Sequence, residues 1–178
     1  MTPPERGPRI RRAALADWEL LRDVRLEMLA DTPLAYLETY GDAARRSDRE
    51  WYTRARRHTA PGSVVLVAVV GPSTTDGRER TVGTMSVFVP AGSAPTVASV
   101  YVSPAHRGTG VADELLAACE DWSRDRGHGS VRLEVHEDNA RAQAFYLRHG
   151  YRFTGDWTPY ALDRSQRDLE MVKTLDPR

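Results

Sequence analysis

One stretch decides the fold of this chain: Val102-Ser103-Pro104-Ala105-His106-Arg107-Gly108-Thr109-Gly110-Val111-Ala112. It has the pattern of a strand end, a turn and a helix start, which points a row of backbone N–H groups at one spot. The helix N-terminus adds about half a positive charge there. Gly108 lets the backbone approach a ligand closely, Gly110 permits a positive φ, and Arg107 can donate a charge-assisted hydrogen bond. The stretch therefore predicts an anion site, most often for a phosphate.

The glycines of this loop have a purely structural reading as well, because glycines are ordinary turn residues between a strand and a helix. The loop lacks the Gly-Lys-Ser/Thr ending of a Walker loop. It also lacks the third glycine of the dinucleotide fingerprint, and the strands before it look antiparallel. These differences weaken the hypothesis of another class of nucleotide-binding protein.

The segments around the loop predict a mixed sheet with helices on both sides. Short apolar runs at 64–70, 81–89 and 96–102 predict an antiparallel meander. The segment 96–137 reads as strand, helix, strand, which is a right-handed βαβ unit with two parallel strands. The other expected elements are strands at 9–12, from 151 and at 168–175, and helices at 17–30, 47–58, 111–126 and 140–149.

Local signals set several boundaries of these elements. Asp17 is a suitable N-cap for the first helix, and Ser47-Asp48-Arg49-Glu50 fits a capping box for the second. Residues 71–80 are rich in Pro, Ser, Thr, Asp and Gly, so we expect a loop there. Residues 1–8 are rich in proline, and we expect a flexible N-terminus.

The composition of the 178 residues indicates one domain, expected over residues 9–178. Lys+Arg and Asp+Glu are 25 each, so the net charge is zero and no general attraction to nucleic acid or an acidic membrane is expected. No apolar run approaches the length of a membrane span, and the N-terminus lacks the apolar core of a secretion signal. The single cysteine, Cys119, fits a reducing cytoplasm, and the Asp, His and Cys spacings predict no metal site.

Two motifs resemble the GCN5-related N-acetyltransferases, the GNAT family. The stretch from Val102 to Ala112 is similar to their coenzyme A signature, Arg/Gln-x-x-Gly-x-Gly/Ala. The stretch Leu133–Tyr151 is similar to the family's next block, a strand followed by Asn-x-x-Ala-x-x-Phe/Leu-Tyr and then Gly-Phe/Tyr. The clear match covers about residues 81–155, with the two motifs in the family's order and spacing.

The resemblance implies a single-domain α/β (α+β) fold. Its mixed, mostly antiparallel sheet has about seven strands, with a V-shaped splay between parallel strands four and five and helices on both faces. The cofactor acetyl-CoA would enter that gap. By position, Val100 and Val102 would pair through their backbones with the pantetheine arm, near Tyr101 and Asn139. The pyrophosphate would lie on the loop residues Arg107, Gly108, Thr109, Gly110, Val111 and Ala112.

The resemblance also implies a direct attack of an amine on acetyl-CoA, with Tyr146 as the general acid for the departing thiolate. Glu134 is the candidate general base through a water, because the fourth strand, Thr96–Tyr101, carries no acid. His136 shares the face of Glu134 and is the alternative base. A backbone N–H near Tyr101 or Val102 would stabilise the oxyanion. Each side chain also has a purely structural interpretation: Tyr146 as a core aromatic, Glu134 as a solvated carboxylate and His136 as a hydrogen-bonded histidine. An amine acceptor that arrives without a proton would need no base.

The acceptor is expected to be a small-molecule or peptide amine, bound by residues of the first two helices and of the last loop. Aromatic and acidic side chains would suit a cationic amine, although the same residues could cover the edge of the core. The basic run on the second helix (Arg45, Arg46, Arg49, Arg54, Arg56 and Arg57) is typical of a solvated face. The candidate acceptor residues are Tyr36, Trp51 and Trp157, with Glu38, Tyr40, Asp156 and Tyr160 nearby.

Two further readings stay open at this point. A non-catalytic acyl-CoA sensor or scaffold would keep the loop from Arg107 to Ala112 but could dispense with Tyr146 and Glu134. A homodimer is open as well.

Cys119 lies on the apolar face of its helix, so we expect a buried small side chain and not a nucleophile. His106 is expected to be structural or to lie beside the phosphate.

Overall fold

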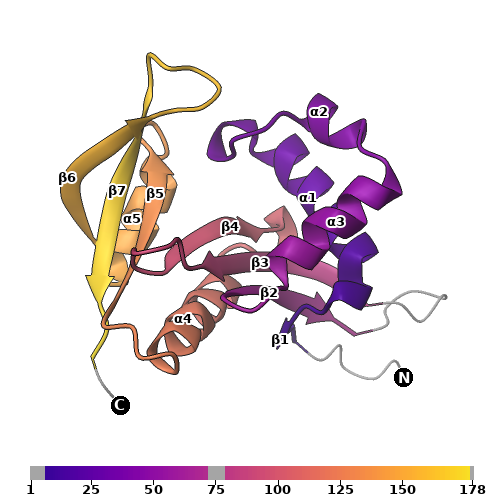
Figure 1. Cartoon of the computed structure of the whole chain (residues 1–178), viewed down its shortest axis with the longest axis horizontal. Helices are drawn as coiled ribbons and strands as arrows, with labels where there is room; N and C mark the ends of the chain where they lie inside the picture. The colour runs from indigo at the N-terminus through magenta and orange to yellow at the C-terminus, as the bar shows by residue number, and fades with distance from the viewer. Residues whose placement is uncertain (1–6, 72–78, 177–178) are drawn as a thin grey trace.

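A single seven-stranded sheet runs through the computed structural model, which describes residues 7–71 and 79–176. The strands follow the order β1-β2-β3-β4-β5-β7-β6 across the sheet, and every neighbouring pair is antiparallel except β4 and β5. Figure 1 shows the two halves, β1–β4 and β5–β7, turned away from each other. The bounds are β1 Arg9–Arg12, β2 Ser63–Val70, β3 Arg80–Phe88, β4 Thr96–Val102, β5 Ser130–His136, β6 Arg152–Pro159 and β7 Arg167–Thr174.

Helices cover both faces of the sheet. In Figure 1 α1, α2 and α3 lie on one face of β2–β4, and α4 lies on the other. Three single 3-10 turns, at Leu15–Asp17, Pro33–Ala35 and Pro104–His106, complete the described structure. The helix bounds are α1 Trp18–Asp31, α2 Tyr40–Ala44, α3 Asp48–His58, α4 Val111–Arg124 and α5 Ala140–Arg148.

The parallel pair β4–β5 is joined over only two residue pairs, Thr96 with Arg132 and Val97 with Leu133. Beyond them the strands separate, and β4 carries an extra residue: the step from Thr84 to Ser86 on β3 faces the longer step from Ala98 to Tyr101. Ser99 lies in that bulge with a φ of 54°. A bulge bends its strand and increases its twist, so it helps to open the gap next to β5.

The main core lies between the sheet and α4, because β2 is apolar on both faces, β3 is buried on both faces and α4 is apolar on one side. Gly83 of β3 allows close packing there. A Cβ at this position would lie 3.1 Å from the Tyr101 carbonyl and 3.2 Å from both Val111 and Leu115. The missing side chain therefore sets the start of α4 tightly against β3 and the end of β4.

Most sequence-based expectations for the fold are confirmed, namely the meander, the parallel βαβ unit, the seven-stranded mixed sheet and the Ser47–Glu50 capping box. Asp17 precedes α1, but its carboxylate makes no cap bond to it. It accepts hydrogen bonds from the Ala14 N–H and from Arg11. Short α2 was not expected, and β6 runs on to Pro159.

Three expectations lie partly or wholly outside the described residues. They are the flexible N-terminus at 1–8, most of the loop at 71–80, and the end of the expected domain at 178. Within the described ranges, no helix has the length and apolar content needed to cross a bilayer.

Candidate active site

The glycine loop joins β4 to α4 as the sequence predicts. Gly108 and Gly110 have φ values of 77° and 90°, and Gly110 is the N-cap of α4. A Cβ built on either glycine would meet no atom within 4 Å, so the space over the loop is open. The first intrahelical bond runs from the Glu114 N–H to the Gly110 carbonyl, which leaves the preceding N–H groups of the first turn free to bind an anion.

Arg107 does not point freely over this loop. Its Nε donates to the Val102 carbonyl at 2.9 Å, and its guanidinium pairs with the carboxylate of Asp31 at the end of α1. The guanidinium also lies 5.9 Å from the centre of the Tyr101 ring. Arg107 therefore ties the loop to α1, and the anion site consists chiefly of backbone N–H groups.

A cleft of about 340 Å³ leads from the loop along the splayed edge of β4 toward α5. Its wall includes Gly108, Gly110 and Ala112 at one end and Asn139 and Tyr146 at the other. Asn139 is the N-cap of α5, because its side chain accepts a hydrogen bond from the Ala142 N–H at 3.1 Å. The cleft thus brings together the two motifs, which are separate stretches of the sequence.

The backbone of β4 is already engaged along this cleft. The Tyr36 hydroxyl donates to the Val100 carbonyl at 2.8 Å, and Arg107 occupies the Val102 carbonyl. Each carbonyl oxygen has a second lone pair. A ligand that donates hydrogen bonds to these two oxygens would therefore share them with Tyr36 and Arg107. The side chain of Tyr101 turns to the other face and donates to Glu27 at 2.9 Å.

Tyr146 lies where the cleft meets a second pocket, and it lines both. Its side chain is buried and packs against Phe145 and Tyr151, at ring separations of 5.3 and 5.6 Å. Burial raises the pKa of the Tyr146 phenol, so it carries its proton at neutral pH. Within the described residues its hydroxyl has no hydrogen-bond partner.

The second pocket has a volume of about 500 Å³ and lies between the first helices and β5 and β7. Glu134, His136 and Asp168 line it from the strands, and Tyr160 lines it from the loop after β6. Loss of hydration raises the pKa of Glu134, and the negative charge of Asp168 raises it further. Among the described residues, the one hydrogen bond to the Glu134 carboxylate is long, 3.4 Å, and comes from Thr158.

His136, the alternative base, is fully engaged by its neighbours. Its Nδ1 accepts a hydrogen bond from the Asp138 N–H at 3.2 Å, so the ring proton resides on Nε2, which contacts Gln166 Oε1 at 2.9 Å. Tyr160 packs edge-on against the ring at 4.7 Å. Both ring nitrogens of His136 thus have partners, which favours Glu134 of the two.

An arginine cluster forms the opposite wall of the second pocket. Arg25 of α1, Arg46 and Arg54 all meet the carboxylate of Glu38. The sequence predicts a solvated face for Arg46 and Arg54, and that prediction is wrong for these two, because both side chains turn inward to Glu38. Arg45, Arg49, Arg56 and Arg57 are exposed as expected. The inward direction of Arg54 could have been predicted from the capping box at Ser47–Glu50. The box fixes where α3 begins, and therefore which residues of α3 face the protein interior.

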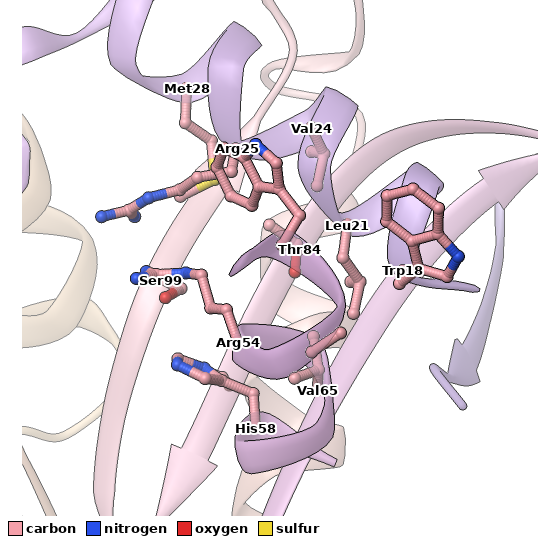
Figure 2. A pocket seen from close by; sticks show the side chains of 13 residues that line it. Trp18, Leu21, Val24, Arg25, Met28, Arg54, His58, Val65, Thr84 and Ser99 are labelled. Atoms are coloured by element: carbon pink, nitrogen blue, oxygen red, sulfur yellow. The ribbon is translucent and has the colours of Figure 1, made fainter. Parts of the chain in front are cut away.

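The three expected acceptor residues lie in different places. Tyr36 is buried and lines both the cleft and the second pocket. Trp51 packs in the core between α1 and α3, beside a small cavity of about 50 Å³ shown in Figure 2. Trp157 lies on β6 with half of its surface exposed and with Arg167 over its ring. Only Tyr36 of the three reaches the pocket that contains Glu134.

The remaining reactive side chains are accounted for by packing. Cys119 is fully buried in the main core, and burial raises the pKa of its thiol. His106 lines the cleft and contacts the Ser103 hydroxyl through Nδ1 at 3.0 Å. In the described part of the chain, no group of three His, Cys, Asp or Glu side chains could hold a metal ion.

The sheet, the splayed parallel pair and the glycine loop agree with a match to a known family. The family model described as "Acetyltransferase (GNAT) family" matches residues 23–151. The chain belongs to the GNAT family. The match extends from α1 to the residue before β6, so Tyr160 and Asp168 of the second pocket come from outside the matched region.

Relatives of this GNAT protein include a streptothricin acetyltransferase of Streptomyces lavendulae, 40% identical over 60 residues, which are 34% of this chain and 32% of the relative. An uncharacterized N-acetyltransferase of Mycobacterium bovis is 34% identical over 83 residues, 44% of this chain and 51% of the relative. The chain thus spans between a third and about half of the length of these curated relatives.

The fold of the GNAT chain also matches solved structures. The structure of yncA from Salmonella typhimurium with its cofactor acetyl-CoA superposes with a TM-score of 0.72. The sequences are 20% identical, and the match covers 97% of this chain and 96% of that chain. At this identity the likeness establishes the fold.

Proposed function

We propose that this protein transfers an acetyl group from acetyl-CoA to an amine acceptor. The observation that carries the proposal is the continuous lining from the glycine loop to Tyr146 and on to Glu134. The cleft and the second pocket share Tyr36, Val100 and Tyr146. A cofactor on one side and an acceptor on the other would therefore meet beside Tyr146.

The residues of the cleft fit the coenzyme A that the GNAT family implies. The open space over Gly108 and Gly110 and the free N–H groups at the start of α4 suit a pyrophosphate. The bulge at Ser99 and the short β4–β5 pairing leave room for an extended arm. When bound, the cofactor supplies an activated acetyl thioester. The chain would hold it through Gly108–Ala112 and through the region of Val100 and Asn139.

Two side chains would handle the protons. Tyr146 would donate to the departing sulfur, because its raised pKa keeps the phenol protonated at neutral pH. Glu134 would accept the proton of the amine through a water, because its carboxylate lines the acceptor pocket with one weak hydrogen bond. The raised pKa of Glu134 makes the carboxylate a better proton acceptor than an ordinary one.

The test separates binding from chemistry. Calorimetry measures coenzyme A binding to the purified protein, and release of free thiol measures turnover with a panel of amines. Tyr146→Phe should lower kcat by about tenfold or more and leave coenzyme A binding nearly unchanged. Tyr151→Phe is the matched control, since Tyr151 is a buried tyrosine of the same core that lines neither the cleft nor the second pocket.

Three results would contradict parts of this proposal. Full turnover by Tyr146→Phe would remove the proton-donor role. Tight coenzyme A binding without thiol release for any amine would favour the non-catalytic acyl-CoA module. If the protein failed to bind coenzyme A, the whole proposal would be wrong.

A further inference from the structure

The two walls of the second pocket carry opposite charge. Glu134 and Asp168 lie on the wall formed by β5 and β7, whereas Arg25, Arg46 and Arg54 lie on the wall formed by the helices. Among the described residues that line the arginine wall, Glu38 supplies the one carboxylate. Three guanidinium groups around one carboxylate leave an excess of positive charge next to the pocket.

Glu38 holds the arginines in place without using up their donors. Arg25 Nε donates to it at 2.7 Å, and Arg54 Nη2 lies 3.4 Å from the same oxygen. Arg46 Nη1 is buried and pairs with the other oxygen at 2.5 Å. Each guanidinium has five N–H donors, and one carboxylate accepts about four bonds in all. Donors therefore remain for a second oxyanion.

The arginine cluster is crowded and partly desolvated. The side chains of Arg25, Arg46 and Arg54 are 12%, 28% and 24% exposed. Burial and the neighbouring Arg25 lower the pKa of Arg54 to about 10, and burial together with Arg54 lowers the pKa of His58 to about 4. Figure 2 shows Arg54 and His58 projecting from α3 toward the side of Ser99. An incoming anion would relieve this repulsion.

We infer that the acceptor is a small amine that also carries a carboxylate, as an amino acid does, with its carboxylate on Arg25, Arg46 and Arg54 and its amine toward Glu134. Arginine forks match a carboxylate in two parallel hydrogen bonds. The acidic wall attracts the ammonium group and brings it to the candidate base. A volume of about 500 Å³ suits a small molecule. A polycationic acceptor, in contrast, would place a positive charge against the arginines.

This inference rests on the proposed function, since it names the acceptor for the same pocket. The test compares matched triplets: an amino acid, its amide, and the amine without the carboxyl group, for each of the twenty side chains. Binding to protein loaded with coenzyme A is measured by calorimetry, and transfer from acetyl-CoA is measured by thiol release. For the preferred side chain, we expect the acid to bind about tenfold or more tightly than its amide or simple amine.

Variants of the arginines test whether the carboxylate of the acceptor binds to the arginine wall. Arg54→Gln and Arg46→Gln should each weaken binding of the acid about tenfold and leave binding of the amide nearly unchanged. Arg56→Gln is the control, because Arg56 is an exposed arginine of the same helix that does not line the pocket. Equal weakening of acid and amide by Arg54→Gln and Arg46→Gln would indicate a structural role and overturn the assignment.

The outcomes separate the two proposals. Amides or simple amines that bind and react as well as the acids, or a preference for polycations, would overturn the acceptor class and leave acetyl transfer intact. Failure of every amino acid to bind would overturn it as well. Binding of the acids without any thiol release would instead count against the proposed enzyme activity.

Discussion

The Tyr36 hydroxyl donates a 2.8 Å hydrogen bond to the backbone carbonyl of Val100, 64 positions further along the chain. This bond fastens the segment between α1 and α2 to the bulged strand β4, where the cleft and the second pocket meet. Tyr160 adds a second connection, because its hydroxyl donates to the Tyr36 carbonyl at 3.0 Å. The acceptor pocket is thus closed by contacts between three distant parts of the chain.

The first prediction concerns this connection. Tyr36→Phe removes the donor and leaves the Val100 carbonyl with one partner fewer, so the free energy of unfolding should fall by about 1 kcal/mol. For a domain of this size, that lowers Tm by about 2–4 °C in a thermal melt. Tyr52→Phe, at an exposed tyrosine, should leave Tm unchanged. An unaltered Tm for Tyr36→Phe would show that the bond contributes nothing net.

The second prediction concerns the pH dependence of acetyl transfer. A base accepts a proton only when it is ionised, and the pKa of Glu134 is raised by desolvation and by Asp168. Activity should therefore fall as pH drops through a pKa above the ordinary range of a glutamate near 4.3. Glu134→Gln should lower kcat about 100-fold or more and abolish this acidic limb of the kcat profile. The control is Glu170→Gln. Glu170 is the cross-strand neighbour of Glu134, and its own carboxylate binds Arg132. An acidic limb that survives in Glu134→Gln would point to another base.

The third prediction concerns stability in acid. Two hydrogen bonds of 2.9 Å from Arg11, together with the Ala14 N–H, lower the pKa of Asp17. A depressed folded-state pKa means that this stabilisation is complete above the unfolded value near 3.9 and is lost as pH falls below it. Asp17→Asn should therefore lower the free energy of unfolding by about 1.5 kcal/mol at pH 7, with a smaller difference at pH 3. Urea titrations at both pH values measure it, with exposed Asp156→Asn as the control; an equal loss at both values would contradict the ionic origin.

The fourth prediction concerns the single thiol. Cys119 is fully buried and its pKa is raised, so in the native protein it should not react with a thiol-specific reagent over minutes. In guanidinium chloride one thiol per chain should react at once. A spectrophotometric assay measures the number of reactive thiols per chain in both conditions. Rapid labelling of the folded protein would mean that α4 opens locally.

Much of the fold could be predicted because its signals are local. Apolar runs mark β2 and β3, the Ser47–Glu50 box starts α3, and the glycines at 108 and 110 place the turn before α4. Short α2 has too few residues to give a periodic pattern. The sequence predicted that the Asp17 carboxylate caps α1, but the side chain of Arg11 on the preceding strand β1 binds it instead.

The sequence by itself determined the glycine loop, the parallel βαβ unit and the candidate pair Tyr146 and Glu134. The loop and the βαβ unit follow from residue type and spacing, which act over a few neighbouring positions, and the pair follows from the resemblance of two motifs to the GNAT family. Only the tertiary structure decided where the long side chains point: Arg107 toward Asp31, and Arg46 and Arg54 toward Glu38. A charged side chain with several rotatable bonds can reach solvent or a buried partner with nearly equal ease. The choice depends on which distant residues the packed sheet and helices bring within its reach.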